Sequence, residues 1–249
     1  RITLLEENKS LKRRIDYRYS FAGIAGVSEK MQRVFSLIIQ VSQIKRPILL
    51  MGESGTGKEM IARAIHKYAF PDEKDFYKVL CSNLPTGALK EKMFYRGNEI
   101  LSEMNDRDEL YSGTIYFEDI HLLPYPLQIE LVDFLEENRF GKGEKNLRIV
   151  ASTEVPLEEE VARGMIRNDL FYFLNAVKIE VPSLRERKED IPFLIDVFLK
   201  EIEEGTNRKP IKISKEALNL LLEYHWPGNI TELKNTLEGM VILSEGEVI

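Results

Sequence analysis

The stretch PILLMGESGTGKEMIARAIH, residues 47–66, decides the fold. It joins a short apolar run, typical of a buried parallel strand, to a glycine-rich turn and then to a helical pattern. Glycines let backbone N–H groups turn inward around phosphate oxygens, the helix start adds positive potential and a lysine neutralises charge. We therefore predict a phosphate-binding loop, and the site binds a nucleotide or descends from one that did. Its residues are Gly52, Glu53, Ser54, Gly55, Thr56, Gly57 and Lys58, followed by Glu59 where the general pattern has Ser or Thr for magnesium.

Helical and strand-like patterns alternate around this loop. Strands alternating with helices predict an α/β fold in which a parallel sheet is flanked by helices. We expect strands at 47–51, 77–80, 114–117, 147–152 and 177–181, and helices at 28–43, 58–68, 126–137 and 157–163.

After Pro182 the patterns become all helical. Ser183 and Glu186 predict a capping box, and Ser214 is expected to cap a later helix. We expect an α/β nucleotide-binding subdomain over 21–182 and a small helical subdomain over 183–249. The helices of the second are predicted at 191–203, 215–224 and 230–243.

Residues 1–20 form a separate helical linker in this interpretation. Apolar and Asn side chains at a 4-3-4 spacing (Leu4, Asn8, Leu11 and Ile15) suit a short coiled coil that pairs two chains. Because two heptads are few, an ordinary solvated helix end explains the pattern equally well, and both interpretations stay open.

Composition narrows the class of protein. The 249 residues are 43% apolar and 31% charged, which excludes a disordered or fibrous chain. A net charge of −6 argues against broad electrostatic capture of nucleic acid. One cysteine, Cys81, excludes an internal disulfide or a cysteine-cluster zinc site and fits the reducing cytoplasm. We see no membrane span or signal peptide, and a start at Arg1 suggests a piece of a longer protein.

A second carboxylate-bearing segment supports the phosphate loop. The predicted strand 114–117 ends in Glu118 and Asp119, where magnesium and an attacking water would be managed. Two acids at a strand end are often only a solvated turn. Here the two acids follow Lys58 of a phosphate loop by about 60 residues, and in that position they are a more specific sign of a nucleotide site.

These segments together resemble the AAA+ central domain of NtrC-type activators of sigma-54 RNA polymerase, the bacterial enhancer-binding proteins. The matching stretches are GESGTGKEMIARAIH (52–66), SLRERKEDIP (183–192) and WPGNITELKN (226–235), with IAGVSEKMQRV (24–34) and VILSEGEVI (241–249). The family's own loop ends in Gly-Lys-Glu, so Glu59 is normal for it. The first residues are similar to the linker that follows the receiver domain of response regulators.

The resemblance implies a helical lid over 183–249, ATP or ADP with Mg²⁺ as cofactors, and assembly into a ring of six or seven subunits. A DNA-binding domain would lie beyond residue 249, and no membrane partner is implied. The implied nucleotide contacts are the loop residues 52–59 with Ile24 and Thr231. The implied catalytic residues are Glu118, which would also hold magnesium through water, Asp119, and Arg167 as a finger acting on the neighbouring subunit.

Two elements of the family are absent from the sequence. The sigma-54-contacting motif Gly-Ala-Phe-Thr-Gly-Ala does not occur in MFYRGNEILSEMNDRDELYSGTIYF, residues 93–117. The segment Phe140–Arg148 is too short for the family's second pore-facing hairpin. We therefore expect that sigma-54 contact is lost.

Nucleotide-facing positions also depart from the family. Its Asp-Glu pair is Glu118-Asp119 here, which lengthens one side chain and shortens the other by a methylene, and a misplacement near 1 Å can cost about a hundredfold in rate. Impaired hydrolysis is the expected result. The other replaced positions are Leu80 for an Asn, Glu154 for the first-sensor Asn, Thr231 for the second-sensor Arg and Phe173 for a second arginine finger.

Three hypotheses follow. The leading one is a transcriptional regulator that binds ATP or ADP as a conformational and assembly switch with little hydrolysis, acting as a repressor or with RNA polymerase carrying another sigma factor. The second is a slow but genuine ATPase in which Asp119 activates water. The third is a non-hydrolysing subunit of a mixed ring that lends Arg167 to an active relative.

Overall fold

The computed structural model describes residues 20–71, 75–83, 112–137, 146–206, 212–244 and 248. Contacts divide the chain into two compact units. The sheet unit holds 37–53 and 61–181, and the lid unit holds 54–60, 182–249 and the residues up to 36. Helices α2 (Glu29–Ser42) and α3 (Lys58–Ala69) contribute residues to both. The predicted coiled coil lies outside the described residues.

The sheet unit is built on a five-stranded parallel sheet with the strand order β4-β5-β6-β3-β7. This confirms the predicted α/β fold. The strands are β3 (Ile48–Met51), β4 (Asp75–Leu80), β5 (Ser112–Glu118), β6 (Asn146–Thr153) and β7 (Val177–Glu180).

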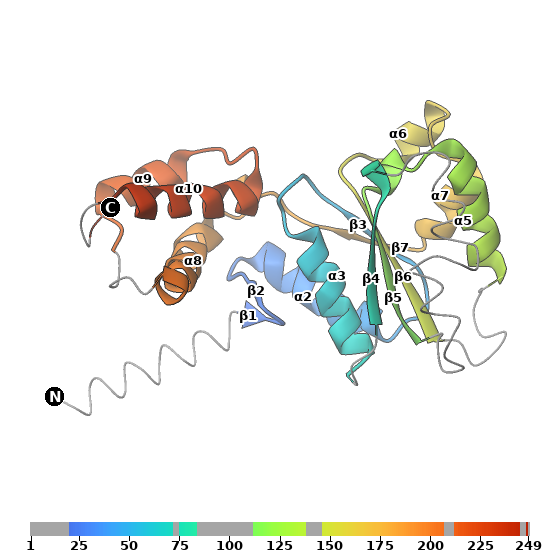
Figure 1. Ribbon diagram of the computed structural model, residues 1–249, viewed down its shortest axis with the longest axis horizontal. Helices are drawn as coiled ribbons and strands as arrows, with labels where there is room; N and C mark the ends of the chain where they lie inside the picture. Colours follow the sequence, from blue (N-terminus) through green and yellow to red (C-terminus); the bar gives the residue numbers. More distant parts are fainter. Residues whose placement is uncertain are drawn as a thin grey trace. The chain divides into compact units, whose positions relative to one another are not determined.

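Helices cover both faces of this sheet, as Figure 1 shows. Alternate strand residues such as Ile115 and Phe117 pack with α5 (Tyr125–Glu137), α6 (Leu157–Ala162) and α7 (Asn168–Leu174). On the opposite face, Thr114 Oγ1 of β5 lies 2.9 Å from His66 Nδ1 of α3. Arg148 of β6 donates there to the Val41 and Ser42 carbonyls at the end of α2. The carboxyl ends of the parallel strands therefore share one edge, where ligands bind in such sheets.

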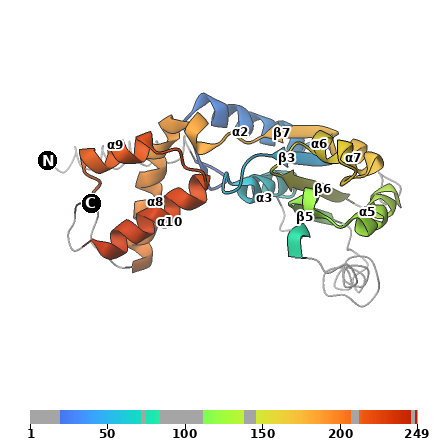
Figure 2. The same ribbon diagram turned by 90° about the horizontal axis from the view of Figure 1, so that it is seen from above.

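The lid unit contains α8 (Ile191–Thr206), α9 (Lys215–Glu223) and α10 (Asn229–Leu243), whose packing is visible in Figure 2. Its core includes Trp226 and Leu237, both buried. A two-stranded hairpin, β1 (Ser20–Phe21) with β2 (Ile24–Ala25), precedes α2. The described residues also include short 3₁₀ turns: η1 (Cys81–Asn83), η3 (Ile120–Leu122), η4 (Leu184–Glu186) and η5 (Lys188–Asp190).

The structure confirms both predicted caps and corrects some bounds. Ser183 and Glu186 form the capping box, and the Ser214 hydroxyl accepts from the Ala217 N–H. The helix predicted at 191–203 extends to Thr206, and α7 was not predicted at all. Helix α7 has only seven residues and its cap position, Arg167, makes no side-chain cap, so neither periodicity nor a start signal reveals it.

The segments that carry two sequence arguments are only partly described. Residues 84–111, where the sigma-54 motif is expected, and 138–145, which hold most of the shortened hairpin, lie outside the described residues. Within the described part of the chain, the longest apolar helices are too short or too polar to cross a membrane.

Candidate functional site

The phosphate loop leaves β3 and has the backbone that its glycines predict. The Gly52 N–H donates to the Thr153 carbonyl (3.1 Å), which ties the start of the loop to β6. Gly55 and Gly57 have φ values of +72° and +96°, a region that glycine adopts without steric cost. Lys58 is buried and begins the 12-residue helix α3, so a positive side chain and a helix N-terminus coincide. That combination favours phosphate.

Three consecutive carbonyls of this loop accept hydrogen bonds from the segment after residue 182. Because a trans peptide directs its C=O and N–H to opposite sides, the N–H that follows each carbonyl points away from these donors. The loop therefore keeps a row of N–H groups on its other side, where an anion would bind. The pairs are Asn229 Nδ2 to the Ser54 carbonyl (2.8 Å), the Ile230 N–H to that of Gly55 (2.9 Å) and Arg187 Nη2 to that of Thr56 (3.1 Å).

The turn that supplies two of these donors is unusual in its backbone. Trp226 and Asn229 both have positive φ, +50° and +53°. Asn229 is fully buried and uses both ends of its amide, since its Oδ1 accepts from the Leu184 N–H (2.7 Å). Trp226 donates through Nε1 to the Leu221 carbonyl (2.8 Å). These bonds fix the turn against the phosphate loop.

An open pocket of about 480 Å³ lies where the loop meets α10. Thr231 is exposed beside the loop: a Cβ on Gly55 would come within 3.2 Å of its Oγ1. The Glu232 carboxylate already accepts from the Gly228 N–H (2.7 Å) and the Tyr224 hydroxyl (3.2 Å). None of the lining residues carries a positive charge. They are Ser54, Gly55, Gly228, Thr231, Glu232, Asn235 and Thr236.

The predicted carboxylates lie at the end of β5, in the sheet unit. Glu118 Oε2 forms an ion pair with Lys78 Nζ of the neighbouring strand β4 at 2.8 Å. Asp119 follows in the left-handed conformation, φ 55° and ψ 52°, and its N–H donates to Ser152 Oγ (3.4 Å). Burial raises the pKa of the nearby Cys81 thiol, with smaller contributions from Asp119 and Glu118. Cys81 is therefore an unreactive buried side chain.

Arg167 is engaged within its own chain. Its Nε and Nη2 donate to the two Asp169 carboxylate oxygens at 3.0 and 2.6 Å, and its guanidinium lies 5.7 Å from the Tyr125 ring centre. The hydrogen bond from Arg167 lowers the pKa of Asp169 and raises that of Arg167. Phe173, at the position of the second arginine finger, packs against the core of the sheet unit.

The remaining predicted residues are spread over both units. Leu80 ends β4 directly opposite Glu118 in the register, and Glu154 is exposed just after β6. Ile24 is buried in β2 of the lid unit. The lid unit brings Ser54, Gly55 and Thr231 together, whereas Glu118, Asp119 and Arg167 belong to the sheet unit. Glu53 within the loop and Glu59 directly after it are both partly exposed.

The residues present fit a nucleotide phosphate better than a protein-held metal. The loop offers N–H groups, a buried lysine and a helix start. Among the residues that the structure describes, no group of three or more His, Cys, Asp or Glu side chains is arranged so that it could hold a metal ion. Magnesium is commonly bound by one or two carboxylates together with substrate phosphates, so it needs no protein cluster of that kind.

Sequence reasoning missed three side chains of these arrangements: Asn229, Arg187 and Lys78. The first two were quoted within matching motifs without a role, because their contacts join segments more than 100 residues apart. Lys78 lies two residues before Leu80 in β4. It was missed because the sequence of β5, which ends in Glu118, does not show which strand will lie beside it and supply a cation.

Residues 24–180 match the sigma-54 interaction domain, and residues 185–249 match the AAA+ ATPase lid domain. The chain is 35% identical over 259 residues to the Nif-specific regulatory protein of Herbaspirillum seropedicae, covering 99% of this chain and 47% of that protein. It is 37% identical over 239 residues to the transcriptional regulatory protein ZraR of Escherichia coli K12, covering 91% and 54%. The chain thus spans about half the length of these relatives.

Solved structures of similar proteins point to the same family. Crystal structures of NtrX from Brucella abortus match with 31% identity. The complex with ATP gives a TM-score of 0.77 over 95% of this chain and 56% of NtrX, and the complex with ADP gives 0.78 over 98% and 56%. The chain belongs to the sigma-54 interaction domain family, the AAA+ central domain of sigma-54-dependent bacterial transcriptional regulators, and continues into the AAA+ lid.

Proposed function

We propose that this chain is the central domain of a response-regulator-type transcriptional regulator in the cytoplasm, which binds ATP or ADP as an assembly or conformational switch with impaired hydrolysis. One contrast carries the proposal. The phosphate loop is complete and held in shape by three hydrogen bonds, whereas Glu118 and Arg167 are each paired with an oppositely charged neighbour.

Nucleotide binding is supported by the loop and by the relatives. The N–H groups of Gly55 and Gly57 and the Lys58 ammonium would hold the phosphates, as helix-start loops do. NtrX of Brucella abortus, similar over nearly this whole chain, has been crystallised with ATP and with ADP. Bound magnesium would neutralise phosphate charge, with Glu118 as its carboxylate through water.

Weak hydrolysis is supported by side chains in each of the two units. Leu80 faces Glu118 in the register without a polar atom that could orient it. Glu154 at the end of β6 would repel the γ-phosphate. Thr231 brings no charge to the pocket lining, where an arginine would stabilise developing negative charge.

The proposal does not include sigma-54 remodelling, because the contacting motif is missing from residues 93–117. We propose instead that the regulator acts as a repressor or with RNA polymerase carrying another sigma factor, and reaches DNA through a domain outside this sequence. Self-association, through the linker as a dimer and through the AAA+ domain as a ring, would be the process that nucleotide controls.

Calorimetry with ATP and ADP in the presence of magnesium tests the proposal, together with phosphate release over a series of protein concentrations. Micromolar binding that Lys58→Ala abolishes, with oligomer size changing and no phosphate released, would support the switch. Absence of binding would refute it. Phosphate release that rises with protein concentration would favour the slow ATPase, and Asp119→Asn should then stop it.

The mixed-ring alternative is favoured by the position of Arg167 at the start of α7, where its side chain is 27% exposed. In that case the chain should stimulate hydrolysis by an active relative without turnover of its own. Arg167→Ala should remove the stimulation, whereas Lys58→Ala should leave part of it, because the finger acts on the neighbour's nucleotide.

A further inference from the structure

We propose that Arg187 is a positioning residue of the phosphate loop: its buried guanidinium fixes the Thr56 carbonyl so that the Gly57 N–H faces the phosphate, and Asp190 holds Arg187 in place. This inference rests on the proposed nucleotide site and assigns a role to residues outside it. It concerns contacts within the lid unit only.

Arg187 is fully buried although its hydrogen bonding is incomplete. Its side chain is 0% exposed, and its Nε and Nη1 have no hydrogen-bond partner among the described residues. Burial lowers the pKa of Arg187, and the nearby Asp190 and Glu186 carboxylates partly offset this. A buried charge with incomplete hydrogen bonding is costly, so packing alone would favour an apolar side chain here.

Arg187 lies between two fixed groups. Its Nη2 donates to the Thr56 carbonyl (3.1 Å), while its Nη1 lies 3.9 Å from Asp190 Oδ2. The two contacts use different arms of one planar guanidinium. Only arginine offers this rigid fork, since the lysine ammonium is a single point charge on a flexible stem.

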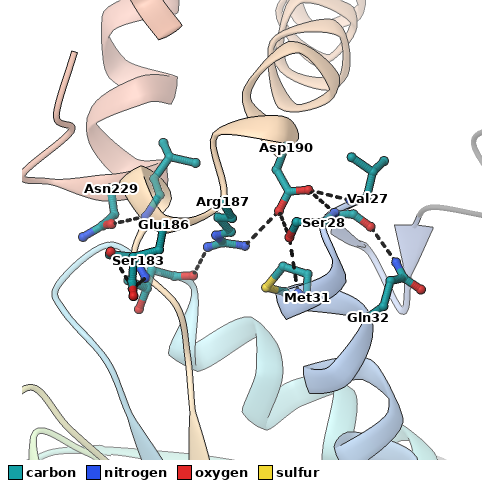
Figure 3. A network of polar contacts seen from close by, with 12 residues as sticks. Val27, Ser28, Met31, Gln32, Ser183, Glu186, Arg187, Asp190 and Asn229 are labelled. Atoms are coloured by element: carbon teal, nitrogen blue, oxygen red, sulfur yellow. Dashed lines mark hydrogen bonds and ion pairs between the residues drawn. The ribbon is translucent and has the colours of Figure 1, made fainter. Parts of the chain in front are cut away.

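Asp190 is itself held from the other side, as Figure 3 shows. Its Oδ1 accepts from the N–H groups of Val27 and Ser28, both at 2.6 Å, and its Oδ2 accepts from Ser28 Oγ (2.9 Å). These donors precede α2, so Asp190 is anchored independently of the phosphate loop. The contacts run from Ser28 through Asp190 and Arg187 to Thr56.

The consequence for phosphate follows from the planar peptide. When the Thr56 carbonyl is fixed, the N–H of the next residue is fixed in the opposite direction. Gly57 has a φ of +96°, a region of the backbone map that glycine leaves easily. Without Arg187 the peptide between Thr56 and Gly57 would rotate more freely, and one phosphate donor would lose its preset direction.

The test compares Arg187→Met and Arg187→Lys with a matched control, Arg148→Met. Arg148 is the second buried arginine of the described residues; it donates to the Val41 and Ser42 carbonyls in the sheet unit and has its own unpartnered Nε. Two readouts are taken: backbone ¹⁵N order parameters of residues 54–58 without nucleotide, and affinity for ADP and AMP by competition with a fluorescent ADP.

We expect Arg187→Met to lower the order parameter of the Gly57 N–H from about 0.85 to below about 0.6 and to weaken ADP at least tenfold, with a smaller loss for AMP, which has no second phosphate. Arg187→Lys should retain part of both, because it can still reach one partner. Asp190→Asn should give a weaker version of the same pattern. Arg148→Met should lower stability without either change.

The inference is overturned if the order parameter of the Gly57 N–H in Arg187→Met stays at the wild-type value or falls no further than in Arg148→Met, as it would for a merely structural residue. It is also overturned if ADP affinity stays at the wild-type value while that order parameter falls. If the wild-type chain binds no ADP, the proposed function fails by itself. The order parameter of Gly57 in Arg187→Lys, a variant that keeps the charge, then still decides whether Arg187 positions the loop.

Discussion

Lys78 Nζ lies 2.8 Å from Glu118 Oε2 and joins strands β4 and β5 at the edge of the sheet where magnesium is expected. Both side chains are partly exposed, 35% and 23%, so the pair contributes at most about 1 kcal/mol. Such a pair is weak enough for a divalent cation to displace. It keeps the Glu118 charge balanced when no magnesium is bound.

Lys78→Met should therefore increase the magnesium dependence of nucleotide binding. With Glu118 unpaired, magnesium no longer competes with an ammonium, and ADP affinity at saturating magnesium should rise by up to about fivefold, the equivalent of 1 kcal/mol. Magnesium titrations of ADP binding measure this. Lys78→Arg keeps the pair and serves as control. A fall in affinity would mean that Lys78 contacts the nucleotide instead.

Gly55→Ala should be far more damaging than Gly164→Ala. The two glycines have nearly the same φ, +72° and +73°, so alanine costs about 1–2 kcal/mol at either from backbone strain. Only at Gly55 would the new Cβ meet a backbone atom, the Gly228 carbonyl oxygen at 2.2 Å. We expect urea unfolding to show the larger loss, and ADP binding to disappear, in Gly55→Ala alone. Equal losses in both variants would contradict the observed contact.

Glu186→Gln should lower stability only above acidic pH. Hydrogen bonds from Ser183, with a smaller contribution from Lys30, hold the pKa of Glu186 below its ordinary 4.5. A depressed pKa gives stability that is present above pH 4.5 and lost as the pH falls through the folded-state value.

At pH 7 the loss in Glu186→Gln should be about 0.5 kcal/mol or less, because about half of the carboxylate side chain is exposed and screened. The difference from the parent should vanish once the pH falls below the depressed pKa of Glu186. Urea unfolding over a pH series checks it. A difference that is the same at every pH would show that the charge plays no part in the cap.

Thr231→Arg should let the site distinguish ATP from ADP. Thr231 is exposed in an open pocket of about 480 Å³, which leaves room for a longer side chain. A hydrogen bond to a charged group is worth about 1.5–3 kcal/mol, so the ratio of ATP to ADP affinity should rise by about tenfold or more. Thr231→Gln, of similar reach without charge, should leave the ratio unchanged. Equal gains in both variants would rule out the electrostatic explanation.

Much of the fold was predictable because its signals are local. The apolar run 48–51 before a glycine turn, the alternation of strands and helices, and the caps at Ser183 and Ser214 each depend on residues close in sequence. Helix α7 and the β1–β2 hairpin were missed because each is too short to show a period. The roles assigned to Glu118, Asp119, Arg167 and Thr231 stay predictions that the experiments above test.

The sequence by itself determined the phosphate loop, the parallel α/β sheet and the helical segment that follows, because spacing and residue type within some 20 residues encode them. Only the tertiary structure decided what holds that loop. Asn229 and Arg187 reach Ser54 and Thr56 across 175 and 131 residues of sequence. From the sequence alone, Asn and Arg are expected at the surface, so the burial of Asn229 and Arg187 could not be predicted. Their partners are backbone carbonyls, which every residue carries, so no side-chain pattern marks them.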